Sequence, residues 1–239
     1  MVGGVVALLM GNQHLHGAMT EEVWPALGAS LKYLDLSGND LEGSIPTSLS
    51  LLPKLIYVNL ANNTLVSSIL PAMFHLQRLT HLLLSQNTLQ GTLPQDSTLV
   101  SLKVLDVSRN QLTGAVPVLQ HSSNLQVAFF SHNQFSGSVP VPAPVNQLGT
   151  KYVAFELGMS NNLLTGTIPA EYQYLPVRNL DLSQNQLTGD ISVLALMPFL
   201  ARARVSENRL TGSLPVKLCL NPIHNNPCDI SYSSQGRFG

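Results

Sequence analysis

The chain repeats itself along most of its length, and this repetition limits its possible folds more than any other feature. The stretch LKYLDLSGNDLEGSIP, from Leu31 to Pro46, recurs as LKVLDVSRNQLTGAVP, from Leu102 to Pro117. Successive copies start 23 to 29 residues apart, a spacing that indicates a solenoid whose units stack on one another. Nine units can be laid down, starting at Val5, Leu31, Leu55, Leu79, Leu102, Leu125, Ala154, Val177 and Leu200.

The units share the pattern L-x-x-L-x-L-x-x-N-x-L-x-G-x-[IVL]-P. The alternation in the middle of the pattern, as in Leu34-Asp35-Leu36, predicts one short strand per unit with one buried face. Glycine follows in eight of nine units, with Ser67 as the exception, and suits a bend with positive φ or close contact between coils. Because proline cannot continue a helix, the closing [IVL]-P pair disfavours a long helix on the outside.

Two further columns of the repeat are polar. An amide side chain offers two donors and an acceptor, so a stacked row of asparagines can satisfy backbone groups where each coil turns away from its strand. A nearly uniform serine column is interpreted as a hydrogen-bonding edge at the strand ends rather than as nucleophiles. The amide row is Asn39, Asn63, Asn87, Asn110, Asn133, Asn162, Asn185 and Asn208, with Gln13 in the first unit, and the serine column is Ser37, Ser85, Ser108, Ser131, Ser160, Ser183 and Ser206, with Ala61 as the gap.

These motifs resemble the leucine-rich repeat family. The tail L-T-G-x-[IV]-P, clearest from Leu164 to Pro169, is similar to the plant-specific subclass found in receptor-like kinase ectodomains and polygalacturonase-inhibiting proteins. The resemblance covers about residues 5–218. It implies an α/β-type leucine-rich repeat solenoid that is right-handed, with about nine coils, a parallel β-sheet on the concave face and an irregular or 3-10 convex side. We therefore expect a solenoid over residues 1–218 and a C-terminal capping segment and tail over 219–239.

Two units depart from the pattern. The third shifts its proline by one residue and lacks the glycine, which predicts a local bulge near Ser67. The sixth is longer, through the proline-rich segment 141–146. Insertions in solenoids map to loops, so this segment is either a recognition loop or a tolerated insertion on the convex side.

The first unit contains an apolar run from Val5 to Met10 that could be mistaken for a secretory signal. With Gln13 placed on the amide position, Val5, Leu8 and Met10 fall on pattern sites, and the segment lacks the positively charged start of a signal peptide. We therefore interpret it as a coil of the solenoid. We expect further sequence, including any export signal, to precede it.

The only cysteines, Cys219 and Cys228, directly follow the last repeat. A small disulfide-closed loop can cover the terminal coil of a solenoid and would imply an oxidising compartment. Two unpaired thiols and a metal site using His224 remain as alternatives, although three candidate ligands are too few for a structural zinc; we expect no metal and no cofactor. Asn62, in the sequon Asn62-Asn63-Thr64, is the candidate glycosylation site.

On a leucine-rich solenoid the strand leucines face inward, and the residues between them face the concave surface, where partner contact is expected. Exposed aromatic side chains are good interface anchors, which favours Tyr33, Tyr57 and Phe129. Arg109 and His132 are expected at the rim. The full set of candidate ligand-binding residues is Tyr33, Asp35, Tyr57, Asn59, His81, Leu83, Asp106, Arg109, Phe129, His132, Glu156, Asp181, Arg202 and Arg204.

Composition excludes several classes of partner. Only 10% of the residues are charged and the net charge is -1, so nucleic acid is not an expected partner. No apolar run reaches the roughly 18 to 20 residues that span a bilayer, so membrane attachment would need a segment absent from this chain.

The leading hypothesis is a non-enzymatic recognition module that binds a protein, peptide or carbohydrate ligand outside the cell, as part of a receptor-like or surface protein. The alternatives are a secreted inhibitor of cell-wall-degrading enzymes and a structural coat protein. An enzyme is not expected, because the histidines are scattered without a nucleophile elbow, phosphate loop or kinase signature. The sequence leaves the oligomeric state open.

Overall fold

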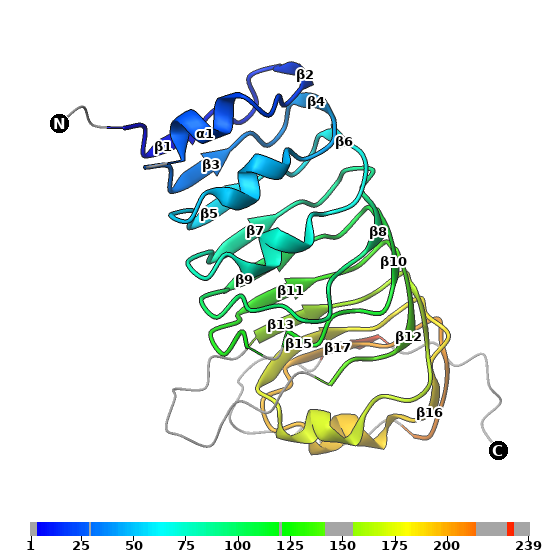
Figure 1. The fold of residues 1–239 in the computed structure, drawn as a ribbon. Helices are drawn as coiled ribbons and strands as arrows, with labels where there is room; N and C mark the ends of the chain where they lie inside the picture. Colours follow the sequence, from blue (N-terminus) through cyan, green and yellow to red (C-terminus); the bar gives the residue numbers. More distant parts are fainter. Residues whose placement is uncertain (1–3, 29, 120, 142–154, 214–228, 232–239) are drawn as a thin grey trace.

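The main sheet of the protein is a stack of short parallel strands, one from each of the nine repeat units and a tenth from the C-terminal segment. The computed structural model describes residues 4–28, 30–119, 121–141, 155–213 and 229–231. Within it, ten strands follow one another in chain order without a crossover, and Figure 1 shows them as a ladder. They are β1 (Ala7–Leu9), β3 (Tyr33–Asp35), β5 (Tyr57–Asn59), β7 (His81–Leu83), β9 (Val104–Asp106), β11 (Val127–Phe129), β13 (Phe155–Gly158), β15 (Val177–Asp181), β17 (Arg202–Arg204) and β19 (Asp229–Ser231).

The register of this sheet aligns equivalent positions of neighbouring units. Leu34 pairs with Val58, and Val58 pairs with Leu82, so the inward residues form one continuous column. The first unit follows the same rule, because Leu8 pairs with Leu34. The apolar run near the N-terminus is therefore a coil of the solenoid, as its register predicted.

A second set of short strands lies where each coil turns past its amide residue (Figure 1). We call their solvent side the lateral face. The strands form three small parallel sheets. The first comprises β2 (His16–Ala18), β4 (Asp40–Gly43) and β6 (Thr64–Leu65); the second β8 (Gln90–Thr92), β10 (Gln111–Gly114), β12 (Gln134–Ser138) and β14 (Leu163–Thr165); the third β16 (Thr188–Asp190) and β18 (Arg209–Thr211).

The return segments hold short helices. These are α1 (Val23–Leu27), η1 (Thr47–Leu51), η2 (Pro71–His75), η3 (Ala170–Tyr174) and η4 (Ile191–Leu196), of which all but α1 are 3-10 helices. The longest of them has six residues. The predicted solenoid with an irregular or 3-10 outer side is confirmed.

The core is one continuous apolar column between the main sheet and the return segments. Its leucines, such as Leu34, Leu82 and Leu105, have no exposed surface. Aromatic side chains fill the wider coils: the rings of Phe130 and Phe135 meet edge to face with centroids 5.8 Å apart. Tyr172 is fully buried, and its hydroxyl donates to the carbonyl of Pro140 at 2.8 Å.

The asparagine row satisfies the backbone between coils, as the sequence predicts. Asn87 is typical: its Oδ1 accepts from the backbone N–H of Leu65 at 3.0 Å, in the preceding coil. Its Nδ2 donates to the carbonyl of Leu60 in that coil at 3.0 Å and to that of Leu84 in its own coil at 3.1 Å. Each amide thus ties two coils together in a place where water does not reach the backbone.

The third unit is irregular where its glycine is missing. Ser67 adopts φ 72°, a left-handed conformation that glycine takes in the other coils. The strand β6 stops at Leu65, and Ser68 forms only an isolated bridge with Gln90. The pairing of β6 with β4 shows no shift of register, so the bulge predicted for this unit is not confirmed; a register shift lies instead between Phe155 and Glu156 in β13.

The first return segment is held by one carboxylate. Glu21 accepts hydrogen bonds from the backbone N–H groups of Thr47 and Ser48 and from both hydroxyls, at the start of η1. These bonds, led by the one from the Ser48 hydroxyl, lower the pKa of Glu21 from 4.5 to about 2. The contact joins the first coil to the second.

This contact predicts a pH dependence of stability. Because the pKa of Glu21 is lower in the folded state, its contribution is complete above about 4.5 and is lost as the pH falls through 2. We expect the melting temperature of the wild type to exceed that of Glu21→Gln at neutral pH and the gap to close across this window. A gap that stays constant down to pH 2 would contradict the assignment. Thermal melts of the two proteins over a pH series provide the measurement.

The segment 142–146, Cys219 and Cys228 lie outside the described residues. The disulfide, the capping segment and the role of the insertion therefore stay predictions. Val141, the first residue of the insertion, is half-buried.

Candidate concave binding face

The solvent side of the main sheet carries two columns of side chains that vary from coil to coil. In most of these strands a buried residue lies between two that reach the surface, as in Tyr57, Val58 and Asn59 of β5. In β13, however, Gly158 is itself buried. The first coil contributes Ala7 and Leu9; one column continues from Ala7 with Tyr33, Tyr57 and His81, and the other continues from Leu9 with Asp35. The backbone conformation repeats from coil to coil, whereas the identities of these side chains change. The residues that could distinguish one ligand from another are therefore concentrated on this face.

The N-terminal part of the face is aromatic. Tyr33 is 41% exposed. The rings of Tyr57 and His81 are tilted against each other with centroids 5.5 Å apart. Partial burial, followed by the nearby charge of Asp35, raises the pKa of Tyr57. Burial, followed by the positive charge of Lys103, lowers the pKa of His81 and so favours its neutral ring.

Three aspartates on this face are fixed by serines of the same coil. In Asp35, Asp106 and Asp181, one carboxylate oxygen accepts from the hydroxyl of the serine two residues later at 2.6 Å. The backbone N–H of that serine donates to the same oxygen at 3.0 to 3.1 Å. This is the hydrogen-bonding edge that the serine column predicted. It also fixes the direction in which each carboxylate offers its second oxygen.

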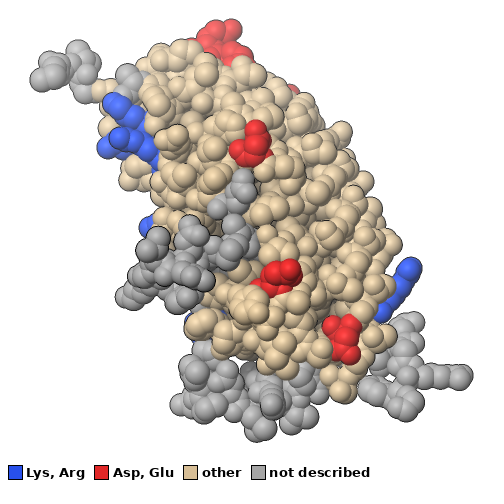
Figure 2. All heavy atoms as spheres, turned by 60° about the horizontal axis from the view of Figure 1, so that its bottom comes forward, with Lys and Arg blue, Asp and Glu red and all other residues tan. Residues whose placement is uncertain are grey.

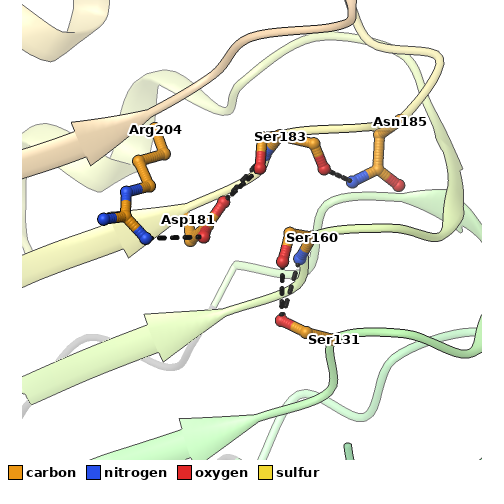
Figure 3. A network of polar contacts seen from close by, with 6 residues as sticks. All are labelled: Ser131, Ser160, Asp181, Ser183, Asn185 and Arg204. Atoms are coloured by element: carbon orange, nitrogen blue, oxygen red, sulfur yellow. Dashed lines mark hydrogen bonds and ion pairs between the residues drawn. The ribbon is translucent and has the colours of Figure 1, made fainter. Parts of the chain in front are cut away.

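The coil with Gly158 breaks this pattern and opens a hollow. Without an aspartate partner, Ser160 donates from its hydroxyl and its backbone N–H to the Ser131 hydroxyl, at 3.0 and 3.1 Å (Figure 3). A Cβ at position 158 would lie 2.9 Å from Cδ1 of Phe129, so glycine leaves the space beside that ring. The hollow measures about 160 Å³ and is lined by Phe129, Glu156, Leu157, Gly158, Asn179, Leu180, Asp181, Arg202 and Arg204.

The hollow is charged on its C-terminal side. Arg202 and Arg204 lie two residues apart in β17, so both side chains point to the same face of the sheet. Arg204 Nη1 lies 3.9 Å from Asp181 Oδ2, a loose and partly exposed ion pair (Figure 3). Asn179, which lies between Glu156 and Arg202 in the sheet, donates to the Glu156 carboxylate at 2.8 Å. Two guanidinium groups beside an aromatic ring suit a planar anionic group such as a carboxylate.

Comparison with known proteins supports the assignment of the repeat. The Leucine Rich Repeat model matches residues 30–52 and 101–120. A plant ice-binding protein of known structure is 30% identical, with a TM-score of 0.74, over 88% of this chain and 67% of its own. The chain belongs to the leucine-rich repeat family. Its L-T-G-x-I-P tail places it in the plant-type subclass.

Two further solved structures of similar fold are plant receptors. One is the ectodomain of the plant membrane receptor kinase GASSHO1/SCHENGEN3 from Arabidopsis thaliana, in complex with CASPARIAN STRIP INTEGRITY FACTOR 2, which is 34% identical with a TM-score of 0.80 over 94% of this chain. Another is the plant peptide hormone receptor RGFR1 in complex with RGF2, 25% identical with a TM-score of 0.60 over 91% of this chain. The chain spans 26% of the first receptor structure and 42% of the second. No curated protein sequence matches the chain.

The leucine-rich repeat framework distributes the candidate residues over three places. Tyr33, Asp35, Tyr57, Asn59 and His81 form the aromatic N-terminal group, and Leu83 and Asp106 continue the second column. Phe129, Glu156, Asp181, Arg202 and Arg204 meet around the hollow. Arg109 and His132 lie apart from both groups, on exposed turns with φ 55° and 57°. Gly158 and Asn179 also line the hollow but are not among the predicted binding residues. The only sequence feature that pointed to them is their position in the two columns of concave-face residues.

Other predicted sites remain open. Asn62 is exposed and its backbone N–H donates to the Ser85 carbonyl at 2.8 Å, so glycosylation there stays a prediction. Among the described residues there is no group of three His, Cys, Asp or Glu side chains suited to a metal. Within the same part of the chain, no helix is long and apolar enough to cross a membrane.

Proposed function

We propose that the protein is an extracellular recognition module that binds a peptide or protein ligand along its concave face. The observation that carries the proposal is the hollow between Phe129 and the arginine pair Arg202 and Arg204. It combines apolar contact area with two guanidinium groups, of which that of Arg204 is loosely paired with Asp181, and Glu156 also lines it. A ligand with a carboxylate, such as a peptide C-terminus or an acidic side chain, would gain both.

The rest of the face extends the site. The tyrosines and His81 lie several coils away from the hollow, on the same sheet and in the same column as Arg202. Neighbouring strands are about 4.8 Å apart, so an extended ligand can cross from the aromatic group to the arginines. The likeness to a plant peptide hormone receptor and to a receptor kinase ectodomain supports a receptor-like role outside the cell.

The described polar groups support a non-enzymatic role. Ser37, Ser108 and Ser183 are hydrogen-bonded to aspartates, and Ser131 and Ser160 to each other. No histidine is paired with these serines in the described part of the chain, so they serve the fold rather than nucleophilic catalysis. A secreted inhibitor of cell-wall-degrading enzymes would use the same face on a protein partner.

The proposal is tested by a binding screen. The purified protein is offered to an array of short synthetic peptides with free C-termini, beside the variant Tyr33→Ala/Tyr57→Ala/Phe129→Ala. The matched control is Leu51→Ala/Tyr174→Ala/Leu196→Ala, which removes three exposed apolar side chains from the return-side helices. We expect the wild type and the control to retain the same peptides and the concave variant to lose them. Equal retention by all three proteins would overturn the proposal.

A second candidate function is ice binding. A plant ice-binding protein shares this fold over most of both chains. The specific observation that favours it here is on the lateral face, where threonine hydroxyls occupy equivalent positions in successive coils. Retention of the protein on growing ice, beside bovine albumin as a non-binding reference, is the direct assay.

A further inference from the structure

The N-terminal part of the concave face carries a carboxylate without a positive partner. Asp35 lies at the end of β3, and within the described part of the chain no lysine or arginine forms an ion pair with it. Its neighbours in the same column, Leu9 and Asn59, are uncharged. Asp181, which a serine fixes in the same way, instead faces Arg204 at 3.9 Å. The charge of Asp35 is therefore available to a ligand.

The Asp35 carboxylate is held in one orientation. Its Oδ1 accepts from the hydroxyl of Ser37 at 2.6 Å and from the backbone N–H of the same residue at 3.0 Å. Its Oδ2 accepts from Nδ2 of Asn59 at 3.2 Å. A carboxylate oxygen has two lone pairs, so Oδ2 can accept one more hydrogen bond. A ligand donor would meet an acceptor that is already in place.

Aromatic rings lie beside this carboxylate. Tyr33 precedes Asp35 by two residues in β3, so both side chains are on the same side of the strand. Tyr57 pairs with Tyr33 in the next strand, and β3 and β5 are neighbours near the N-terminal end of the ladder (Figure 1). The charge of Asp35 contributes to the raised pKa of Tyr57, which places the carboxylate close to that phenol. The faces of tyrosine rings attract cations.

His81 adds a hydrogen-bond acceptor to this group. The hydroxyl of Thr80 donates to the carbonyl of Ile56 at 2.9 Å and lies 2.8 Å from Nδ1 of His81. A hydroxyl has only one hydrogen, so Nδ1 carries a proton and donates to Thr80. In the neutral ring, which burial favours, Nε2 is then left as an acceptor.

Positive charge lies at the margins of this group. Lys32 directly precedes Tyr33, and Lys103 lies one coil beyond His81 and lowers its pKa. The position for a ligand cation is therefore at Asp35 rather than at His81. Charged groups are sparse elsewhere as well: Figure 2 shows few acidic and basic residues, well separated, on the face that it presents. A carboxylate between aromatic rings is thus a distinctive local feature.

We infer that Asp35, Tyr33 and Tyr57 form a subsite for an arginine side chain of the ligand. We call these three residues the cation subsite. It rests on the proposed function, since it is a second contact for a peptide that binds the concave face. A planar guanidinium can lie against a tyrosine ring and donate to Oδ2 of Asp35 at the same time. A purely apolar ligand would instead remove water from the carboxylate without supplying a counter-charge.

The sheet fixes the distance between the cation subsite and the arginine pair. Seven strand-to-strand steps separate β3 from β17. At about 4.8 Å a step this is roughly 34 Å, and an extended peptide advances about 3.3 Å per residue. A ligand whose C-terminal carboxylate lies at Arg202 and Arg204 would therefore carry its arginine about ten residues before the C-terminus.

The test uses two sets of synthetic peptides of about fourteen residues with free C-termini. In one set a single arginine is moved along otherwise randomised sequences, and in the other citrulline, its uncharged isostere, takes its place. Retention is compared for the wild type, Asp35→Asn and the control Asp40→Asn, which removes an exposed carboxylate of the same coil on the lateral face. Asparagine suits position 35, because Asn59 accepts the N–H of Ala61 in the same way in the next coil. Melting curves confirm that each variant is folded.

We expect the wild type and Asp40→Asn to prefer arginine over citrulline by at least about tenfold, most strongly about ten residues before the C-terminus, and Asp35→Asn to lose this preference. Tyr33→Leu/Tyr57→Leu, which keeps apolar area without the rings, should reduce it. A wild type that retains no peptide of either set would overturn the proposed function. Retention without a preference for arginine, or a preference lost equally in Asp35→Asn and Asp40→Asn, would overturn only the cation subsite.

Discussion

Replacing Asn133 by alanine is expected to lower the free energy of unfolding by about 2 to 4 kcal/mol. Asn133 is 8% exposed, and its Nδ2 donates to the carbonyls of Val107 and Phe130 at 3.0 and 3.1 Å. Its Oδ1 accepts from the N–H of Leu112 at 3.0 Å. Alanine leaves these backbone groups buried without partners, and water cannot enter to replace the amide.

Two comparison variants separate the hydrogen bonds from side-chain volume. Asn133→Asp keeps the shape but turns the donor into an acceptor facing two carbonyls, so we expect it to be at least as destabilising as alanine. Gln134→Ala, one residue away and exposed, should change stability by less than about 0.5 kcal/mol.

Because coils of a solenoid can open separately, the measurement should be local as well as global. Hydrogen exchange at the Leu112 amide reports the lost acceptor directly, and chemical denaturation reports the total. Unchanged protection of Leu112 in Asn133→Ala would show that the amide row does not hold the coils together.

The second large effect is on binding. For a peptide identified by the array, Arg202→Ala/Arg204→Ala should weaken affinity by at least about 100-fold, since hydrogen bonds to charged groups contribute about 1.5 to 3 kcal/mol each and 1.4 kcal/mol is tenfold. The charge-matched control is Arg78→Ala/Arg209→Ala, which removes two exposed arginines that are not part of the hollow. Calorimetric titration of the three proteins at fixed salt gives the comparison. Equal weakening in both double variants would indicate a general loss of charge rather than a site.

Much of the fold was predictable because it repeats. The alternation around Leu34 locates a strand, and the same alternation in each unit gives the main sheet and its register. The amide row could be predicted because an asparagine that recurs at the same position of every unit indicates the same structural role in every coil, namely hydrogen bonding to the backbone. The lateral sheets were not predicted. The glycine of each unit indicated a bend, but the pairing of strands beside that bend depends on how closely neighbouring coils stack, which the sequence of a single unit does not show.

The site was predictable only as a surface. Column positions placed Tyr33, Phe129 and Arg204 on the concave face, but nothing in the sequence indicated that a hollow forms at Gly158. The hollow lies where glycine, at position 158, stands in the column between Phe129 and Asp181, so that no side chain fills the space beside the ring of Phe129. Such a feature arises between coils. Arg109 and His132 occupy equivalent positions in the repeat and were predicted at the rim of the concave face. They lie on turns with positive φ and are not part of the hollow.

The central claim is that the arginine pair recognises a carboxylate on the ligand. It is tested most directly by titrating the same peptide with a free C-terminus and with an amidated one, against the wild type and against Arg202→Ala/Arg204→Ala. If the C-terminal carboxylate occupies the hollow, amidation should weaken binding to the wild type by at least about tenfold and leave binding to the variant unchanged. If an acidic side chain occupies it instead, replacing that residue by its amide counterpart should give the same pattern. A loss of equal size in the wild type and the variant for every carboxylate of the peptide would contradict the claim.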